Sequence, residues 1–266
     1  MDLFIKRLKK LLRLLPPLLL RDIRERYAGS IMGVFWTFLQ PMFFILLYWL
    51  IFSQILKVRI HAETGDNIPF IVFLLSGILP WFALQEGVLR GASSIIEKRH
   101  IIKKVIFPAE LFPIASVISA IIHHGIGIII FLSVFFIWKG GVSLLQISLI
   151  ITILSVQMVL TVGLSFIFSA LTVYVRDIIQ ILGTVFQAIF YISTILYPLT
   201  FVPKKLKVFI LSNPVTSLAE AYHNVILYGR FPALGSTAYL LIVTVVVFFT
   251  GIYLFRKLKM GFADVL

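Results

Sequence analysis

Long apolar runs separated by short charged stretches make up most of this 266-residue chain. A helix rises about 1.5 Å per residue, so about 20 apolar residues are needed to cross the roughly 30 Å hydrocarbon layer of a membrane. We therefore expect an all-α, polytopic membrane protein with six membrane-spanning helices. The expected spans cover about residues 30–56, 68–88, 111–138, 144–174, 178–197 and 235–255.

A strongly basic stretch at residues 90–113 separates the second span from the third. At 100° per residue, its apolar and basic residues fall on opposite faces, which predicts an amphipathic helix at about residues 94–106. This helix is too short and too charged to cross the membrane, so we expect it in the cytosol, with its apolar face docked on a soluble partner. A solvated loop that only obeys the positive-inside rule is the alternative. The apolar face holds Ile101, Ile102, Val105 and Ile106, and the basic face holds Arg99, His100, Lys103 and Lys104.

A second amphipathic helix is predicted at residues 3–15. We expect it to lie among the cytosolic lipid headgroups and to end at Pro16-Pro17, because proline removes a helical hydrogen bond. Residues 1–29 then form a cytosolic segment before a transmembrane domain at residues 30–266. The apolar face of this helix comprises Phe4, Ile5, Leu8, Leu11, Leu12 and Leu15, opposite Lys6, Lys9, Lys10 and Arg13.

Residues 208–231 are the ambiguous part of the pattern. They are apolar enough for a seventh span, but Asn213-Pro214 divides them and polar residues such as Glu220 would lie at membrane depth. Six spans place both termini and most Lys and Arg residues in the cytosol, as the positive-inside rule requires. We therefore expect residues 199–230 to form a re-entrant pair of half-helices on the outer side, lining a pore.

Composition supports a membrane protein and changes how the charge is interpreted. Hydrophobic residues make up 60% of the chain and the mean hydropathy is +1.06, which no soluble core of ordinary composition could bury. The net charge of +13 lies beside the spans, so anionic headgroups explain it without nucleic acid. There are no cysteines, which excludes disulfides and thiolate metal sites.

The sequence carries no signature of catalysis or of nucleotide binding. No phosphate-binding GxxxxGK[ST] loop and no convincing catalytic set occur, so we expect no cofactor on this chain. His123 and His124 lie within the third span, where a metal site or a proton relay is conceivable. Adjacent helical positions point about 100° apart, however, so interhelical hydrogen bonding is favoured and no metal site is expected. Gly125, Gly127 and the pairs Gly29–Gly33 and Gly87–Gly91 predict close helix contacts.

Aromatic residues supply 14% of the chain. Many are typical of a lipid-facing aromatic belt, and Trp49 and Trp138 fit interfacial positions. A group near the expected outer half could instead stack on sugar rings and line a polysaccharide path. This group comprises Tyr48, Phe52, Phe70, Phe73, Tyr191, Tyr197 and Phe201.

Three sequence blocks resemble the membrane subunits of type-2 ABC exporters that move O-antigen, capsule or teichoic-acid polymers. The blocks are RDIRERYAGSIMGVFWTFLQPMF at residues 21–43, the Pro-Trp turn and Lys-Lys-Val-x-Phe-Pro end of residues 77–113, and the Arg-Asp start and Asn-Pro step of residues 175–198 and 213–229. The blocks stand in the family's order, and the resemblance covers nearly the whole chain.

The resemblance implies a homodimer in the bacterial inner membrane, joined to two separate ATP-binding cassette subunits that bind ATP and Mg²⁺. Residues 94–106 would be the coupling helix, the N-terminal helix an interface helix, and the substrate a lipid-linked polysaccharide. A type-2 exporter of drugs or lipids is the nearest alternative. A membrane-embedded lipid or sugar transferase is a second one.

Overall fold

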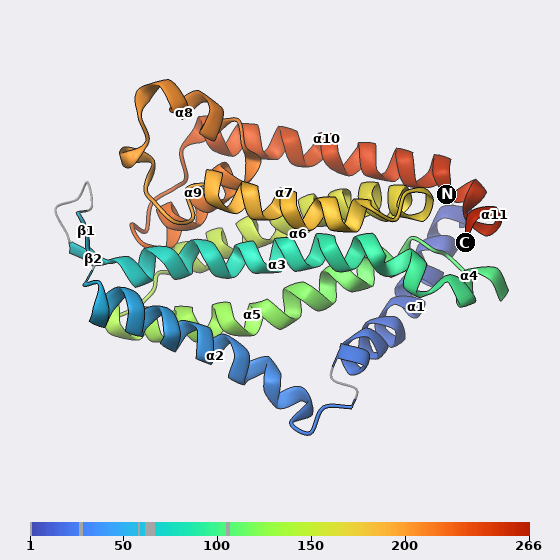
Figure 1. Ribbon diagram of the computed structural model, residues 1–266, viewed down its shortest axis with the longest axis horizontal. Coiled ribbons are helices and arrows are strands. Elements are labelled where there is room, and N and C mark those ends of the chain that lie inside the picture. The colour runs from blue at the N-terminus through green and yellow to red at the C-terminus, as the bar shows by residue number, and fades with distance from the viewer. Residues whose placement is uncertain (1, 27–28, 58, 62–66, 105–106) are drawn as a thin grey trace.

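The computed structural model describes residues 2–26, 29–57, 59–61, 67–104 and 107–266, and describes residues 2–12 by their backbone only. The described chain is a bundle of long helices with one short antiparallel strand pair, β1 (Arg59–His61) and β2 (Asn67–Pro69) (Figure 1). Five helical segments are long and apolar enough to cross a membrane, and a shorter apolar helix accompanies them. The expected all-α, multi-pass membrane protein is confirmed. The five segments are Trp36–Ile55, Phe70–Glu97, Leu111–Lys139, Leu144–Tyr174 and Leu234–Gly261.

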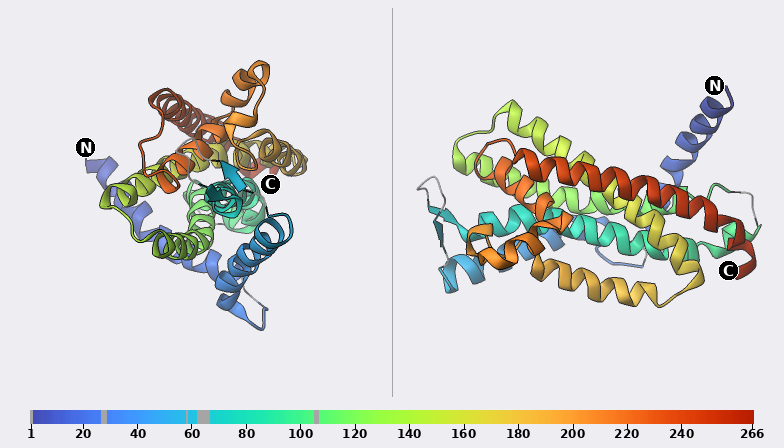
Figure 2. Two further views of the ribbon diagram at one scale, coloured as in Figure 1. Left: turned by 90° about the vertical axis from the view of Figure 1, so that its left-hand side faces the viewer. Right: turned by 90° about the horizontal axis from the view of Figure 1, so that it is seen from above.

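Helix α3 (Phe70–Glu97) occupies the centre of the bundle. Seen along the bundle, the other spans surround it (Figure 2). It packs against α5 (Leu111–Lys139), α6 (Leu144–Tyr174) and the short helix α9 (Pro214–Ile226). Small residues permit this close packing: a Cβ added to Gly87 would lie 2.7 Å from Thr161 Cγ2, and one added to Gly91 would lie 2.8 Å from Ser165 Cβ.

Other glycines fall into two classes. A Cβ on Gly127 would lie 2.9 Å from Pro41 Cβ, so the close helix contact predicted at Gly127 is confirmed, and its partner is the first span. Among the described residues, no atom lies within 4 Å of such a Cβ at Gly125, Gly29 or Gly33, and the predicted contacts at these three positions are wrong. Gly29 and Gly33 instead adopt positive φ angles in the connection before α2 (Trp36–Tyr48), where glycine is favoured because it lacks a Cβ.

The two ends of the bundle differ. Both chain ends lie with α1 (Asp2–Arg26), α4 (Arg99–Lys104) and α11 (Phe262–Val265) at one end, and the β pair and α8 (Lys204–Leu211) lie at the other (Figure 1). The basic stretch and the two termini therefore lie at the same end of the bundle (Figure 1). The side of the membrane that this end faces stays a prediction.

The third and fourth spans begin and end where the sequence predicts. Gly140 ends α5 with a left-handed φ of 88°, a conformation that glycine adopts at little cost. Ser143 caps α6: its side chain accepts a hydrogen bond from the Gln146 backbone, and the Gln146 side chain accepts one from the Ser143 backbone. Helix α10 (Leu234–Leu258) likewise matches the sixth expected span.

Several predicted helix boundaries are wrong. The first span begins later than predicted, at Trp36 in α2 (Trp36–Tyr48), because a 3-10 turn (Gly33–Phe35) comes directly before it. The span then continues as a π-helix (Trp49–Ile55). Helix α3 extends through Glu97, so residues 94–106 are not one amphipathic helix and α4 contains only six residues. Arg90 and Lys98, at the start and just past the end of this extension, pair with Asp22 and Glu25 of α1, and Ser94 is buried. These contacts favour the continued helix.

The predicted end of the N-terminal helix at Pro16-Pro17 is also wrong, because α1 is continuous to Arg26. Proline removes two amide donors there, but the following turns gain contacts with the bundle: Leu18 packs on its core and several charged residues form ion pairs with α3. Tertiary contacts therefore outweigh the local cost. The N-terminal turns project away from the other helices (Figure 2).

The fifth span is shorter than predicted. Helix α7 (Ile178–Ile192) has 15 residues, about 22 Å, and stops because Ser193 adopts an extended conformation. The Tyr197 hydroxyl donates to the carbonyls of Tyr191 and Ile192, at 3.1 and 3.0 Å. These bonds satisfy carbonyls that the end of a helix leaves free, which is necessary at membrane depth.

The predicted division of residues 199–230 into two short helices is confirmed, which rules out the alternative of a continuous seventh span there, while their position on the outer side stays a prediction. Helices α8 and α9 are too short to cross, and Asn213 separates them by accepting a hydrogen bond from Val215 at the start of α9. Nearly all of α9 is buried, and Gln146 donates to the Val225 carbonyl (3.1 Å) at its C-terminal end. A 3-10 turn (Leu199–Phe201) precedes α8, and another (Lys259–Gly261) precedes α11.

Candidate functional site

The basic turn at the end of α3 presents its cations to solvent. Arg99, His100, Lys103 and Lys104 are exposed, whereas Ile101 and Ile102 are half-buried against the core cluster around Ile95 and Phe112. Val105 and Ile106 lie outside the described residues. Part of the apolar face is therefore already packed within the chain, and docking of a partner on the remainder stays a prediction.

The predicted interface helix forms the first half of α1. Its apolar positions Phe4, Leu8, Leu11 and Leu12 lie in continuous helix, and their side chains fall outside the described part of the chain. Membrane-surface binding by these residues stays a prediction.

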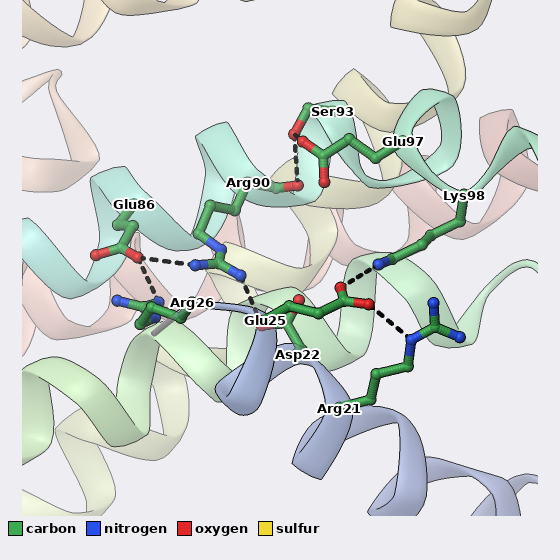
Figure 3. Close-up of polar contacts among 9 residues, drawn as sticks. All are labelled: Arg21, Asp22, Glu25, Arg26, Glu86, Arg90, Ser93, Glu97 and Lys98. Carbon is green, nitrogen blue, oxygen red and sulfur yellow. Dashed lines mark hydrogen bonds and ion pairs between the residues drawn. The ribbon is translucent and has the colours of Figure 1, made fainter. Parts of the chain in front are cut away.

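A charged cluster joins the end of α1 to the inner half of α3 (Figure 3). Arg26 pairs with Glu86, Arg90 Nη2 lies 2.7 Å from Asp22 Oδ2, and Lys98 pairs with Glu25. Along α3 the pairs follow the order Glu86, Arg90 and Lys98, and α4 begins directly after Lys98.

This cluster was not predicted, because residues 21–27 were expected only as part of the cytosolic segment before the first span. The available signal was complementary charge at helical spacing: Arg21, Asp22, Glu25 and Arg26 on one segment, and Glu86, Arg90 and Lys98 on another. The sequence does not state which segments meet, so the pattern alone could not pair them.

Glu25 lies at the solvent edge of the cluster. Hydrogen bonds from Lys98 and Arg21 lower the pKa of its carboxyl below the usual 4.5, against a smaller opposing effect of burial. The carboxylate is therefore charged at neutral pH and can hold Lys98 in place.

His124 extends the cluster to α5. Its Nε2 lies 2.6 Å from Glu86 Oε2, which confirms interhelical hydrogen bonding for this histidine. Glu86, His123 and His124 each offer a ligand atom within 4.8 Å of the others, so the histidine pair does have a third possible metal ligand. Arg26 and Arg90, however, both lie beside Glu86, and two cations oppose binding of another one.

A buried polar chain connects α3, α6 and α9. Gln157 Nε2 donates to the Pro80 carbonyl (2.7 Å), and the Tyr222 hydroxyl donates to Gln157 Oε1 (2.8 Å). Gln157 and Tyr222 are almost completely buried. Because an unpaired polar group is costly at membrane depth, this chain fixes the position of α9 relative to the centre of α3.

Four of the predicted path aromatics form a continuous row between α2 and α3. Centroid distances are 6.3 Å for Tyr48–Phe52, 4.8 Å for Phe52–Phe70 and 6.3 Å for Phe70–Phe73. The row ends where Phe73 stacks on His223 at 4.0 Å. Phe73 is buried, so it contacts no solvent in this conformation.

The other three predicted aromatics lie apart from this row. Tyr191 is exposed at the end of α7, Tyr197 caps that helix, and Phe201 is exposed beyond it. The structure thus divides the seven residues between two regions on different sides of α3. Their role in a path stays a prediction.

A polar stripe on α7 was not predicted. Gln180, Thr184, Gln187 and Tyr191 recur at helical spacing and are all exposed, whereas Leu182 and Phe186 on the opposite face are buried. Amides facing hydrocarbon are unfavourable, so this face suits a water-filled space or a second subunit better than lipid. The helical spacing of these residues can be seen in the sequence, but which side of the helix is buried in the bundle and which side is exposed cannot.

Comparison with known proteins agrees with this architecture. The chain is 28% identical over 256 residues to an O-antigen export system permease protein RfbA of Klebsiella pneumoniae, covering 92% of each chain. It is 28% identical to the protein of the same name in Myxococcus xanthus, over 94% of each chain. It is 26% identical to the polysialic acid transport protein KpsM of Escherichia coli, over 90% of this chain and 91% of that one.

The profile of a membrane protein family, described as ABC-2 type transporter, matches residues 16–227. This region includes the end of α1, the charged cluster, α4 and both half-helices. The match covers most of the chain, which therefore belongs to the ABC-2 type transporter family.

Proposed function

We propose that this chain is the permease subunit of an ATP-driven exporter of a lipid-linked polysaccharide in the bacterial inner membrane. The relatives named as O-antigen and polysialic acid transport proteins match nearly their full length. The polar stripe on the exposed face of α7 is the observation that carries the proposal to this chain. Its amides and hydroxyls can exchange hydrogen bonds with a passing chain of sugar hydroxyls.

The stripe also supports a homodimer. A single α7 closes no channel, whereas two copies facing one another enclose a polar space between their stripes. Tyr191, at the outer end of the stripe, offers a ring face on which sugars can stack. The proposed path runs from the inner end of α7 toward the outer half-helices.

Energy comes from two copies of a separate ATP-binding cassette subunit, which carry ATP and Mg²⁺. The proposed docking site is α4, with both termini on the same cytosolic side. The charged cluster supports this role because it joins α4, through α3, to α1 in one rigid unit. Closure of the ATPase dimer would move this unit and shift α3 relative to α7.

Reconstitution tests the proposed function. The chain and the ATPase subunit from the same source, placed in inverted vesicles with a lipid-linked polysaccharide, should make the polymer inaccessible to an added glycosidase in an ATP-dependent way. Replacing Gln187 by Leu should reduce this transport while leaving assembly intact. Transport of a drug or phospholipid but not of the polymer would favour the alternative type-2 exporter.

Docking is tested separately by pull-down of the ATPase subunit. Ile102→Asp should remove apolar burial and weaken association at least about tenfold, whereas Lys103→Ala on the exposed face should cost about 1 kcal/mol or less. Because Ile102 also packs within the chain, thermal unfolding of each variant is the control. Equal retention of the ATPase by wild type and a folded Ile102→Asp variant would contradict docking at α4.

A further inference from the structure

A pocket of about 290 Å³ lies between α2, α3 and α5, within their membrane-spanning parts. Most surfaces between these helices are apolar, but this pocket is lined by the polar side chains of Gln40, Gln85, Glu86, His123 and His124. The rings of Phe44 and Phe82 form another part of its wall. It lies on the side of α3 that faces α2 and α5, and no residue of α7 lines it.

Two amides in this pocket lack partners. Among the residues that the structure describes, neither Gln40 nor Gln85 forms a hydrogen bond. Each amide offers two donors and one acceptor group, and leaving them unpaired in a membrane-spanning segment is costly. The pocket therefore favours an occupant with several hydrogen-bonding groups over a lipid tail.

The charges of the pocket select against ions. Glu86 directs one carboxylate oxygen toward Arg26 (Figure 3). The other oxygen lies 2.6 Å from His124 Nε2, so both oxygens are already engaged. Arg26 pairs with Glu86 and Arg90 pairs with Asp22, so these charges are balanced within the described part of the chain and offer no free counter-charge to a phosphate or a metal cation. A neutral ligand needs no counter-charge.

The aromatic wall favours a ring-shaped ligand. Phe44 and Phe82 lie 6.3 Å apart with their planes tilted by 48°, and the Phe82 ring lies 6.0 Å from that of His124. Apolar ring faces beside amides and a carboxylate match the two kinds of surface on a sugar, whose C–H face is apolar and whose edge carries hydroxyls. The volume falls near the lower end of ligand pockets, which suits one ring and not a whole lipid.

We propose that this pocket binds a single neutral sugar ring, with Gln40 and Gln85 as its specificity-determining hydrogen-bonding groups. The inference rests on the proposed function, because the ring would belong to the exported polysaccharide. It adds a binding site in each subunit, separate from the proposed path along α7. Occupation of the pocket would hold α2 against α3 through the ligand.

Binding can be measured without transport. The full-length chain is placed in nanodiscs, because common maltoside detergents carry sugar rings themselves. Saturation-transfer NMR then tests the methyl glycosides of glucose, mannose and galactose, with empty nanodiscs as the background. At least one glycoside should receive saturation from the wild-type protein.

The variants assign the signal to this pocket. The double variant Gln40→Leu with Gln85→Leu should weaken binding about tenfold or more, because two hydrogen bonds are lost. Gln54→Leu is the matched control, since Gln54 is an exposed glutamine in the same span but does not line the pocket. It should bind like wild type. Size-exclusion profiles and thermal unfolding of all variants confirm that they fold.

Three results would overturn the inference: no saturation of any glycoside above empty nanodiscs, equal binding by the double variant, or displacement of the glycoside by inorganic phosphate or Zn²⁺. Each of these differs from failure of the proposed function. If the wild-type protein transports polysaccharide but binds no glycoside, only the proposed sugar site in this pocket is contradicted. If it binds glycosides but moves no polymer with its ATPase, the proposed exporter function is contradicted.

Discussion

Helices α2 and α3 are nearly equal in hydropathy but opposite in burial. The most apolar 18-residue stretch of the span that contains α2 has a mean hydropathy of 1.7, and 6% of its residues are buried. The corresponding stretch of α3 has a mean hydropathy of 1.6, and 78% of its residues are buried. Hydropathy therefore identifies a membrane-spanning helix but does not tell whether its neighbours are protein or lipid. This distinction depends on how closely another backbone can approach.

Small residues account for the difference. Helix α3 contains Gly77, Ala83, Gly87, Gly91 and Ala92, and α6 packs tightly against two of its glycines. The span Trp36–Ile55 contains neither glycine nor alanine, and its large side chains hold other helices away. In membranes, where apolar side chains gain little by leaving lipid, close backbone approach supplies much of the packing energy.

The largest expected effect comes from a matched pair of leucines. Leu74 in α3 is 1% exposed, and Leu74→Ala should lower the free energy of unfolding by about 2–5 kcal/mol by leaving a cavity. Leu46 in α2 is 61% exposed, so Leu46→Ala should cost less than about 1 kcal/mol. Thermal unfolding in nanodiscs measures both. An equally large loss for Leu46→Ala would mean that a second subunit covers α2.

Removal of the central carboxylate should have the next largest effect. Glu86 contacts Arg26 of α1 and His124 of α5, so Glu86→Gln leaves the partly buried Arg26 without a counter-charge. We expect a loss of about 2 kcal/mol and faster trypsin cleavage at Arg24, as α1 separates from α3. Glu97→Gln, at an exposed position of the same helix, is the control and should keep α1 protected. Unchanged cleavage of Glu86→Gln would show that apolar contacts alone hold α1.

The buried polar chain predicts a smaller effect. Tyr222→Phe removes the hydroxyl that donates to Gln157 and should cost about 1–2 kcal/mol, because Gln157 Oε1 then stays buried without this donor. Tyr253→Phe, on the exposed face of α10, should be close to neutral. Hydrogen exchange in α9 should increase only in Tyr222→Phe. Equal exchange in both variants would show that the hydrogen bond between Tyr222 and Gln157 does not stabilise α9.

The smallest effect concerns the Glu25–Lys98 pair at the solvent edge. Lys98→Ala should cost at most about 1 kcal/mol at pH 7, since exposed pairs are weak. The folded-state pKa of Glu25 lies below 4.5, so the stabilisation is complete above that pH and is lost as the pH falls through the lowered pKa. The difference in unfolding temperature between Lys98→Ala and wild type should therefore vanish well below pH 4.5. A difference that persists there would arise from packing of the lysine stem.

The sequence predicts much of this fold because hydropathy and helix boundaries are local properties. Gly140 and Ser143 mark the junction of α5 and α6, and Asn213-Pro214 marks the break between the half-helices. Where prediction failed, distant contacts decide the outcome. Leu18, Asp22 and Glu25 gain partners in the bundle, which carries α1 past its two prolines.

The candidate sites were less predictable than the fold for the same reason. His124 was singled out by its position within a span, but its partner Glu86 lies 38 residues away. Gln40 and Gln85 define a pocket only because α2 packs beside α3. The stripe on α7 has a readable spacing, yet burial of Leu182 and Phe186 is needed to tell which face is free.

The hydrogen bond from Gln157 to Pro80 divides α3 into two unequal arms. At 1.5 Å per residue, about 26 Å of helix lies between Pro80 and Glu97, and about 15 Å lies between Pro80 and Phe70. If the helix tilts as one body about this point, a displacement of α4 reaches the outer end in the opposite direction and reduced by nearly half. The protein would thereby convert a larger motion at the proposed ATPase docking site into a smaller and more forceful one at the half-helices.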